Sequence, residues 1–126
     1  MSLLLVISVI ITTNAQTFNN IGQAVFMSEY ATSTGAVCLD GTPGLFYIAK
    51  GAASTKYLIY FQDGGWCSGY TQSQGKGFDA CWNRRQGSMG STKSDPSTKN
   101  LNATFGMDQN QSSNPTMYNW NHIYVR

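Results

Sequence analysis

The stretch Tyr57–Cys67 reads YLIYFQDGGWC and changes character in its middle. Its first five residues are apolar and favour β-structure, so they predict a strand. A glutamine, an acid, two glycines, a tryptophan and a cysteine follow, and this composition predicts that the strand ends in a sharp turn. Consecutive glycines have no Cβ atom to shield the backbone, so such a turn leaves amide N–H donors bare.

Bare amide donors after a strand can bind anions. In α/β-hydrolases the loop after the third strand supplies one donor of the oxyanion hole, in motifs of the H-G-G-G kind. Asp63, Gly64, Gly65 and Trp66 have that form and follow a predicted strand. Loss of one such donor typically raises the reaction barrier by about 3 kcal/mol. An ordinary glycine turn, with Trp66 as a core residue, is the alternative interpretation of the same four residues.

The composition limits the partners that the chain can have. The chain has 126 residues, 11% of them charged, and a net charge of +2. This charge is too small to neutralise many phosphates, so we expect no nucleic-acid partner. The length suits one domain or part of one. Aromatic residues make up 13% of a chain that is otherwise rich in Asn, Gln, Ser and Thr, which favours extracellular work and sugar contacts.

The N-terminus predicts secretion. Residues 3–11 read LLLVISVII, an uncharged apolar run too short to cross a bilayer, and Ala15 follows where a signal peptidase would cut. We therefore interpret residues 1–15 as a secretory signal, interpret residues 16–126 as a segment of one domain, and expect an extracellular product. A buried strand is the alternative for the apolar run. Nothing else in the sequence is long and apolar enough for a membrane span.

Three cysteines, Cys38, Cys67 and Cys81, would be exposed to an oxidising compartment, and an odd number leaves one without an intramolecular partner. The flexible segment between Cys67 and Cys81 can close a short loop, and a bridge there would stabilise the fold by about 3 kcal/mol. The sequence has no C-x-x-C pair and its single histidine, His122, is distant, so we expect no metal site. We expect no cofactor either.

Strand signals occur near residues 23–27, 45–49, 56–62 and 122–125, and residues 78–86 are the best helix candidate. The second and third strand segments flank a glycine-containing turn, which predicts a hairpin. Residues 87–115 are mostly Ser, Thr, Asn, Gly and Lys, which predicts a long loop that buries little. This stretch also holds two N-glycosylation sequons, at Asn102 and Asn110, which predict surface glycans.

Three separated segments together resemble one known family. They read GAVCLDGTPGLFYI, YLIYFQDGGWC and MYNWNHIYVR, and their order and separations are similar to those in the N-terminal part of the pectin acetylesterase family, whose animal relative is the carboxylesterase Notum. The resemblance covers residues 34–126. It implies an α/β class, with this chain as the N-terminal, incomplete part of an α/β-hydrolase-like fold that has a strand-rich start, one short helix and a long polar loop.

The resemblance also implies an oxyanion-hole loop in this chain. Its donors would come from Gly64, Gly65 and Trp66. Asp63 stands where plant members usually have a third glycine and animal relatives have an acidic residue.

The resemblance bears on the cysteines too. Cys67 with Cys81 would match a family disulfide. Cys38 would match one whose partner lies just past residue 126, so that Cys38 is unpaired in this chain.

The groups that carry out ester hydrolysis are missing from the sequence. It has no G-x-S-x-G, and His122 precedes any candidate serine in a family whose order is Ser, Asp or Glu, then His, so we interpret His122 as a strand residue. We expect a truncated, secreted carboxylic-ester hydrolase, by resemblance a deacetylase of O-acetylated polysaccharide, that is inactive by itself. The alternative is a non-catalytic secreted carbohydrate-binding protein that stacks sugar rings on Trp66, Tyr70, Trp82, Tyr118 and Trp120.

Overall fold

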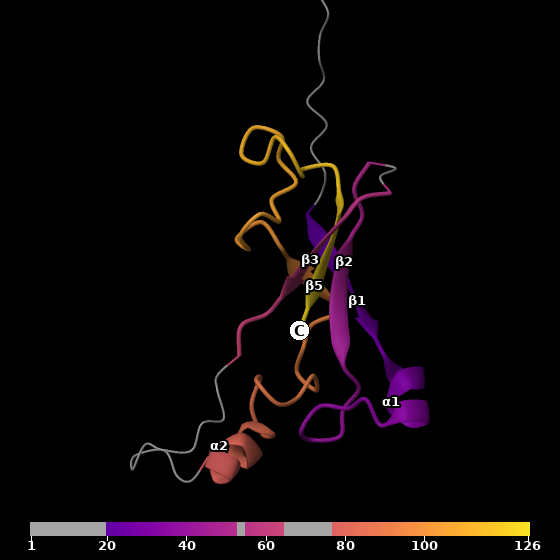
Figure 1. Ribbon diagram of the computed structural model, residues 1–126, viewed down its shortest axis with the longest axis vertical. Coiled ribbons are helices and arrows are strands. Elements are labelled where there is room, and N and C mark those ends of the chain that lie inside the picture. The colour runs from indigo at the N-terminus through magenta and orange to yellow at the C-terminus, as the bar shows by residue number, and fades with distance from the viewer. Residues whose placement is uncertain (1–19, 53–54, 65–76) are drawn as a thin grey trace, which may run out of the picture.

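A computed structural model describes residues 20–52, 55–64 and 77–126. Within these ranges five strands form one mixed sheet in the order β3-β5-β2-β1-β4 (Figure 1). The strands are β1 (Ile21–Phe26), β2 (Leu45–Ala49), β3 (Tyr57–Phe61), β4 (Thr98–Asn100) and β5 (Asn121–Val125). Two short helices, α1 (Ser28–Thr34) and α2 (Gly77–Arg84), accompany the sheet.

The strand order differs from the expected one. β3 and β5 run parallel, with Tyr60 beside Tyr124, and the other pairs in the sheet are antiparallel. β5 lies between β2 and β3, so the hairpin predicted from residues 45–62 is wrong. The chain passes from β3 through α2 and β4 before it returns as β5, and parallel neighbours require a long connection of this kind.

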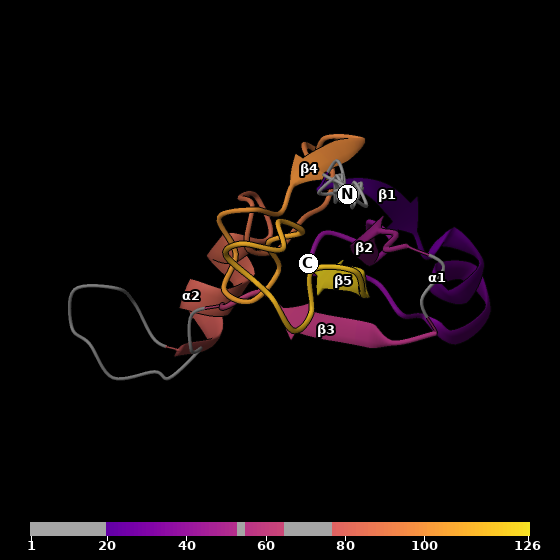
Figure 2. The same cartoon turned by 90° about the horizontal axis from the view of Figure 1, so that it is seen from above.

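The two faces of the sheet carry different side chains because successive residues of a strand point to opposite sides. We call one side the covered face. Its side chains come from Ala24, Leu45, Tyr47, Ala49, Leu58, Tyr60, His122 and Tyr124. The opposite side, the open face, carries Val25, Phe46, Ile48, Tyr57, Ile59, Phe61, Ile123 and Val125. Figure 2 shows α2 and the segment before β5 on one side of the sheet and α1 on the other.

The segment before β5 closes the covered face. Leu101 and Met107 are fully buried and belong to the same hydrophobic cluster as Leu45 and Tyr47. Polar side chains take the place of regular structure in this segment, since Asn114 Nδ2 donates to the carbonyl oxygens of Gly106 at 2.9 Å and Asp108 at 2.8 Å. The expectation that residues 87–115 bury little is therefore wrong.

His122 joins β5 to this segment. Its side chain is fully buried, and its Nδ1 and Nε2 atoms lie 2.8 Å from Met107 O and 2.9 Å from Met117 O. A neutral imidazole donates to one of these carbonyls, and an imidazolium donates to both. The histidine is a buried strand residue with a structural role.

Tyrosines extend the covered face toward the carboxyl end of β5. The ring of Tyr60 stacks on Tyr124 with centroids 5.5 Å apart, and Tyr47 meets Tyr124 edge-on at 6.3 Å. Lys99 Nζ lies 4.9 Å from the centroid of the Tyr124 ring. Tyr47 Oη donates to Pro96 O at 3.0 Å. Burial raises the pKa of both Tyr47 and Tyr124, so these two hydroxyls stay neutral.

Candidate functional site

The carboxyl ends of the parallel strands β3 and β5 lie side by side, and the predicted oxyanion loop begins there. The Gln62 amide donates to Val125 O at 2.9 Å, and the chain then leaves the sheet through Asp63 and Gly64, which are both exposed. Open α/β sheets bind their ligands outside the carboxyl ends of the strands. This end of the sheet is therefore the candidate functional site.

A pocket of about 200 Å³ opens at this end of the sheet. It is lined by Gln62, Asp63, Gly64, Met89 and Arg126. The Gln62 Oε1 atom is buried and has no hydrogen-bond donor within the described part of the chain. A Cβ atom added at Gly64 would meet nothing within 4 Å, so the backbone there is open to approach. An unsatisfied acceptor and a bare backbone thus border one pocket.

Arg126 is held in place at the edge of this pocket. Its Nε lies 2.9 Å from each carboxylate oxygen of Asp95, and its NH2 donates to Ser88 O. The two charged side chains are 11% and 12% exposed. Charge-assisted bonds between such side chains are short and directional. Because Asp95 balances its charge, Arg126 shapes the pocket and does not act as an uncompensated anion-binding group.

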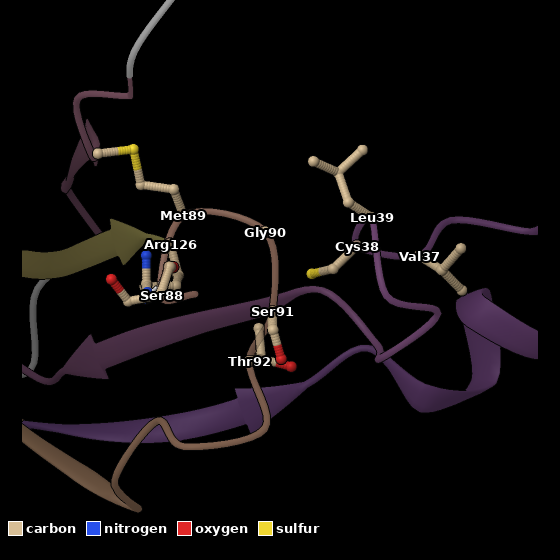
Figure 3. A pocket seen from close by; sticks show the side chains of 9 residues that line it. All are labelled: Val37, Cys38, Leu39, Ser88, Met89, Gly90, Ser91, Thr92 and Arg126. Carbon is tan, nitrogen blue, oxygen red and sulfur yellow. Dashed lines mark hydrogen bonds between the residues drawn. The ribbon is translucent and has the colours of Figure 1, made fainter. Parts of the chain in front are cut away.

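A second pocket, of about 220 Å³, shares Met89 and Arg126 with the first. Cys38 lines it as a half-buried free thiol, with Sγ 3.8 Å from Pro43 O. Figure 3 shows the Cys38 thiol pointing across the pocket toward the segment that contains Met89 and Gly90. The cysteine and the carboxyl end of β5 therefore lie on either side of one cavity.

Asp40 fixes the turn that carries Cys38. Its Oδ1 accepts from Thr42 N at 3.1 Å and from Thr42 Oγ1 at 2.6 Å. Hydrogen bonds from Ser91 and Thr42 lower the pKa of Asp40 to about 2. Gly41 has φ of 86°, a left-handed conformation that glycine adopts without steric cost. Asp40 is therefore a turn residue, and the turn is tied to the segment around Ser91.

The structure covers part of the predicted oxyanion set. Gly64 lies at the candidate site, whereas Gly65 and Trp66 fall outside the described ranges. Among the cysteines, Cys81 is disulfide-bonded. Cys67 also falls outside the described ranges, so its pairing with Cys81 stays a prediction.

Both sequon asparagines lie on the segment that closes the covered face. Asn102 and Asn110 are exposed. Asn102 Oδ1 accepts from Asn20 Nδ2, and Asn110 Oδ1 accepts from the Ser112 amide at 2.9 Å. Their glycosylation stays a prediction.

Positively charged side chains lie over two of the aromatic rings that were expected to stack on sugars. Trp82 is 52% exposed, and the Arg85 guanidinium lies 4.1 Å from its ring centroid. Trp120 is half-buried with Lys56 Nζ at 5.4 Å, and Tyr118 is half-buried as well. Each tryptophan therefore has one ring face covered by a positive charge. The other two aromatic residues of that set, Trp66 and Tyr70, lie outside the described ranges.

Sequence reasoning missed three of the pocket residues. Met89 belongs to a segment that carries no motif, whereas Gln62 and Arg126 lie within two of the segments that carry the family resemblance but had no role of their own there. In the described ranges, no group of three or more His, Cys, Asp or Glu lies close enough to hold a metal ion. The helices in those ranges are too short or too polar to cross a membrane.

Comparisons with known proteins agree with the resemblance seen in the sequence. The pectinacetylesterase family model matches residues 16–126. Pectin acetylesterases 7 and 11 of Arabidopsis thaliana are 35% and 34% identical to this chain over 104 residues, which is 78% of this chain and 23% of each relative. The chain therefore spans about a quarter of the length of these relatives.

The fold is similar to that of a solved structure. The Wnt deacylase Notum from Drosophila superimposes with a TM-score of 0.58 at 19% identity, over 82% of this chain and 26% of that chain. This likeness confirms the expected α/β-hydrolase-like fold. Because the family model matches nearly the whole sequence, the chain belongs to the pectinacetylesterase family.

Proposed function

We propose that this chain is the N-terminal segment of a secreted carboxylic-ester hydrolase that removes O-acetyl groups from a polysaccharide. The family match over residues 16–126 carries the proposal, since it includes the Gly-Gly-Trp loop. The position of Gly64 supports it, because Gly64 comes three residues after the end of β3 and borders a pocket at the carboxyl end of the sheet. Relatives named as pectin acetylesterases indicate the class of substrate.

The proposed role of the segment is electrostatic. In the full enzyme a serine attacks the acetyl carbonyl, and the carbonyl oxygen becomes negatively charged in the tetrahedral intermediate. Amide donors at Gly65 and Trp66 stabilise that oxygen, and water then releases acetate from the acylated serine.

The serine and the histidine base of this reaction are not in the sequence, which has no G-x-S-x-G. We therefore expect the 126-residue chain to show no turnover of a chromogenic acetate ester. Trp82→Ala in the same chain distinguishes this proposal from the alternative, a carbohydrate-binding protein. Retention on insoluble acetylated pectin that Trp82→Ala abolishes would favour a carbohydrate-binding protein, whereas absence of retention would count against one.

The downstream genomic sequence tests the proposal directly. We expect the reading frame to continue past Arg126 with Tyr-Cys, which would provide a partner for Cys38. Further on it should encode a G-x-S-x-G, an Asp and a His in that order. A stop codon with no hydrolase-like coding sequence in any frame beyond it would contradict the proposal.

In such a longer form, Gly65→Pro tests the oxyanion role. The substitution removes an amide donor, so we expect kcat to fall by about 10²–10³-fold with little change in KM. Gly87→Ala is the matched control, because an added Cβ there lies no closer than 3.8 Å to its nearest neighbour. An equal effect of the two substitutions on kcat would refute the role of the loop.

Processing in the secretory pathway is part of the same proposal. Residues 1–15 would be removed, Cys67 and Cys81 would be bridged, and the exposed Asn102 and Asn110 would carry glycans. Intact-mass measurement before and after glycosidase treatment, combined with non-reducing peptide mapping, checks each of these modifications. An N-terminus at Met1 in secreted material would contradict the signal.

A further inference from the structure

The sequence contains two Asp-Gly dipeptides, Asp40-Gly41 and Asp63-Gly64. This dipeptide is chemically reactive, because the amide nitrogen after an aspartate can attack the side-chain carboxyl and glycine has no Cβ atom to hinder the approach. Both aspartates are exposed, so access to water does not distinguish them. The two sites differ instead in the hydrogen bonds around each dipeptide.

The reaction conserves atoms. The glycine nitrogen forms a bond to the aspartate Cγ, and the hydroxyl of the protonated carboxyl leaves with the amide proton as water, which gives a cyclic succinimide. Water then opens the ring at either carbonyl. Opening at the main-chain carbonyl breaks the original peptide bond and leaves an isoaspartate, whose main chain runs through the former side chain. The reaction therefore needs a mobile amide and a protonated carboxyl that can meet.

The structure holds Asp40-Gly41 in a geometry that opposes this attack. The Gly41 amide donates to Cys38 O at 3.0 Å, so the attacking nitrogen is already bonded elsewhere. Asp40 Oδ1 accepts from Thr42 N at 3.1 Å and from Thr42 Oγ1 at 2.6 Å. Hydrogen bonds from Ser91 and Thr42 lower the pKa of Asp40 to about 2, which keeps the carboxyl ionised near neutral pH. Both reacting groups of this dipeptide are therefore restrained.

Asp63-Gly64 lies where the chain has just left the sheet. The Gln62 amide donates to Val125 O at 2.9 Å, and in the described part of the chain neither the Asp63 carboxyl nor the Gly64 amide has a hydrogen bond. A Cβ atom added at Gly64 would meet nothing within 4 Å. Both residues line the pocket of about 200 Å³ at the candidate site. The two reacting groups are therefore free to meet.

We propose that Asp63-Gly64 is a site of spontaneous isomerisation to isoaspartate, and that the hydrogen-bonded turn protects Asp40-Gly41 from the same reaction. The modification needs no partner other than water. It lengthens the main chain by one methylene group directly before Gly64 and Gly65. The isomerisation itself does not rest on the proposed function, whereas its effect on an oxyanion loop does.

Peptide mapping of the 126-residue chain after prolonged incubation at neutral pH tests the proposal. Isoaspartyl and aspartyl peptides have equal mass but separate by chromatography, and Asp40 in the same molecule is the internal control. We expect isoaspartate at Asp63 and at least about tenfold less at Asp40, because a pKa of about 2 instead of 3.8 reduces the protonated fraction of Asp40 by more than that. Equal amounts at the two sites, or none at Asp63, would overturn the proposal.

The same incubation in concentrated urea separates the effect of the structure from that of the neighbouring residues. Unfolding removes the hydrogen bonds of the turn, so the two dipeptides should then isomerise at similar rates. A difference that persists unchanged in urea would overturn the protective role of the turn.

Two variants change one site at a time. Ser91→Ala removes the hydrogen bond that contributes most to the low pKa of Asp40, so isoaspartate should increase at Asp40 and stay the same at Asp63. Gly64→Ala adds a Cβ atom that hinders the attack, and the space around Gly64 accommodates it, so isoaspartate should decrease at Asp63 alone. Peptide maps that neither variant changes would contradict both assignments.

Activity of the longer form tests the consequence for the loop. Under the proposed function, kcat should fall in proportion to the isoaspartate found at Asp63, because the inserted methylene group displaces the donors that follow. A kcat that stays constant while isoaspartate accumulates would contradict the oxyanion role of the loop, whereas the peptide map alone decides whether the isomerisation occurs.

Discussion

The two faces of the sheet are built from the same alternating strands but differ in what lies on them. On the covered face, Leu45 and Tyr47 are 1% exposed because Leu101 and Met107 pack over them. On the open face, Ile59 and Phe61 are 53% and 70% exposed. Three of the four strand pairs are antiparallel, and antiparallel sheets commonly have one face packed on a core and the other in solvent. The difference indicates that the stability of the described region comes from one face, while the other is surface available for contacts.

The largest expected effect compares a core residue of the covering segment with a residue of the open face. Leu101→Ala removes a fully buried side chain, so the free energy of unfolding should fall by about 2–5 kcal/mol. Ile59→Ala should lower it by less than about 1 kcal/mol, because Ile59 is half exposed. Chemical denaturation of both variants measures the two losses of unfolding free energy. Equal losses would show that the two faces do not differ in the way described.

The next effect concerns neighbouring residues of β5 that point to opposite faces. His122→Phe removes the imidazole hydrogen bonding at Met107 O and Met117 O, which keep the Asn20 side-chain amide at 2.7 Å and the Trp120 backbone amide at 3.0 Å as donors. It also puts a larger ring into a fully buried site, so the free energy of unfolding should fall by about 1–3 kcal/mol. Ile123→Val, on the open face, should cost about 0.5–1.5 kcal/mol. Thermal unfolding followed by circular dichroism ranks the two. A larger loss in Ile123→Val than in His122→Phe would contradict the structural role of His122.

A smaller difference in stability is expected between removing the hydroxyl of a covered tyrosine and removing that of an exposed one. Tyr47→Phe removes the hydrogen bond to Pro96 O and should lower the free energy of unfolding by about 0.5–1.5 kcal/mol. Tyr57→Phe, at an exposed position of the open face, should change it very little. Urea denaturation at constant pH gives both values. A larger loss in Tyr57→Phe would mean that the open face is covered in solution.

The smallest effect belongs to neither face. Asp40 has a pKa of about 2 against an ordinary 3.8, so its ionised form contributes stability that is fully present above pH 3.8 and lost as the pH falls toward 2. Because the side chain is exposed, solvent screens this contribution and the loss should be small. Asp40→Asn should remove it, which a comparison of acid denaturation curves measures. A steeper curve in Asp40→Asn would contradict the assigned hydrogen bonds.

The elements with strong patterns were predictable. Residues 45–49 form β2 as expected, and β3, β5 and α2 agree with expectation within two residues at each end. The helix α1 was not foreseen because SEYATST has no apolar periodicity and buries no residue. Its Thr32 and Ser33 hydroxyls donate to carbonyl oxygens four residues earlier, and Gly35, with φ of 71°, ends it.

The order of the strands and the composition of the site depend on distant segments. A hairpin was the local interpretation of residues 45–62, and the insertion of β5 between β2 and β3 is visible only once residues more than 60 positions apart are paired. The position of Gly64 after a strand could be predicted, because a strand that runs into two glycines is a local sequence pattern. Gln62, Met89 and Arg126 meet there through the sheet order, which no local pattern records.

The central claim is that an irregular polar segment closes one face of the sheet. Amide hydrogen exchange of the wild-type chain, followed residue by residue, tests this claim most directly. The Leu101 amide donates to Asn20 O at 3.0 Å and the Met107 amide to Thr104 O at 3.0 Å, so both should exchange as slowly as amides of β2. The Gln62 amide donates to Val125 O of β5, and backbone direction alternates along a strand, so the amides of Tyr57 and Ile59 point away from β5 and should exchange fast. Exchange of Leu101 and Met107 as fast as that of Ile59 would contradict the account.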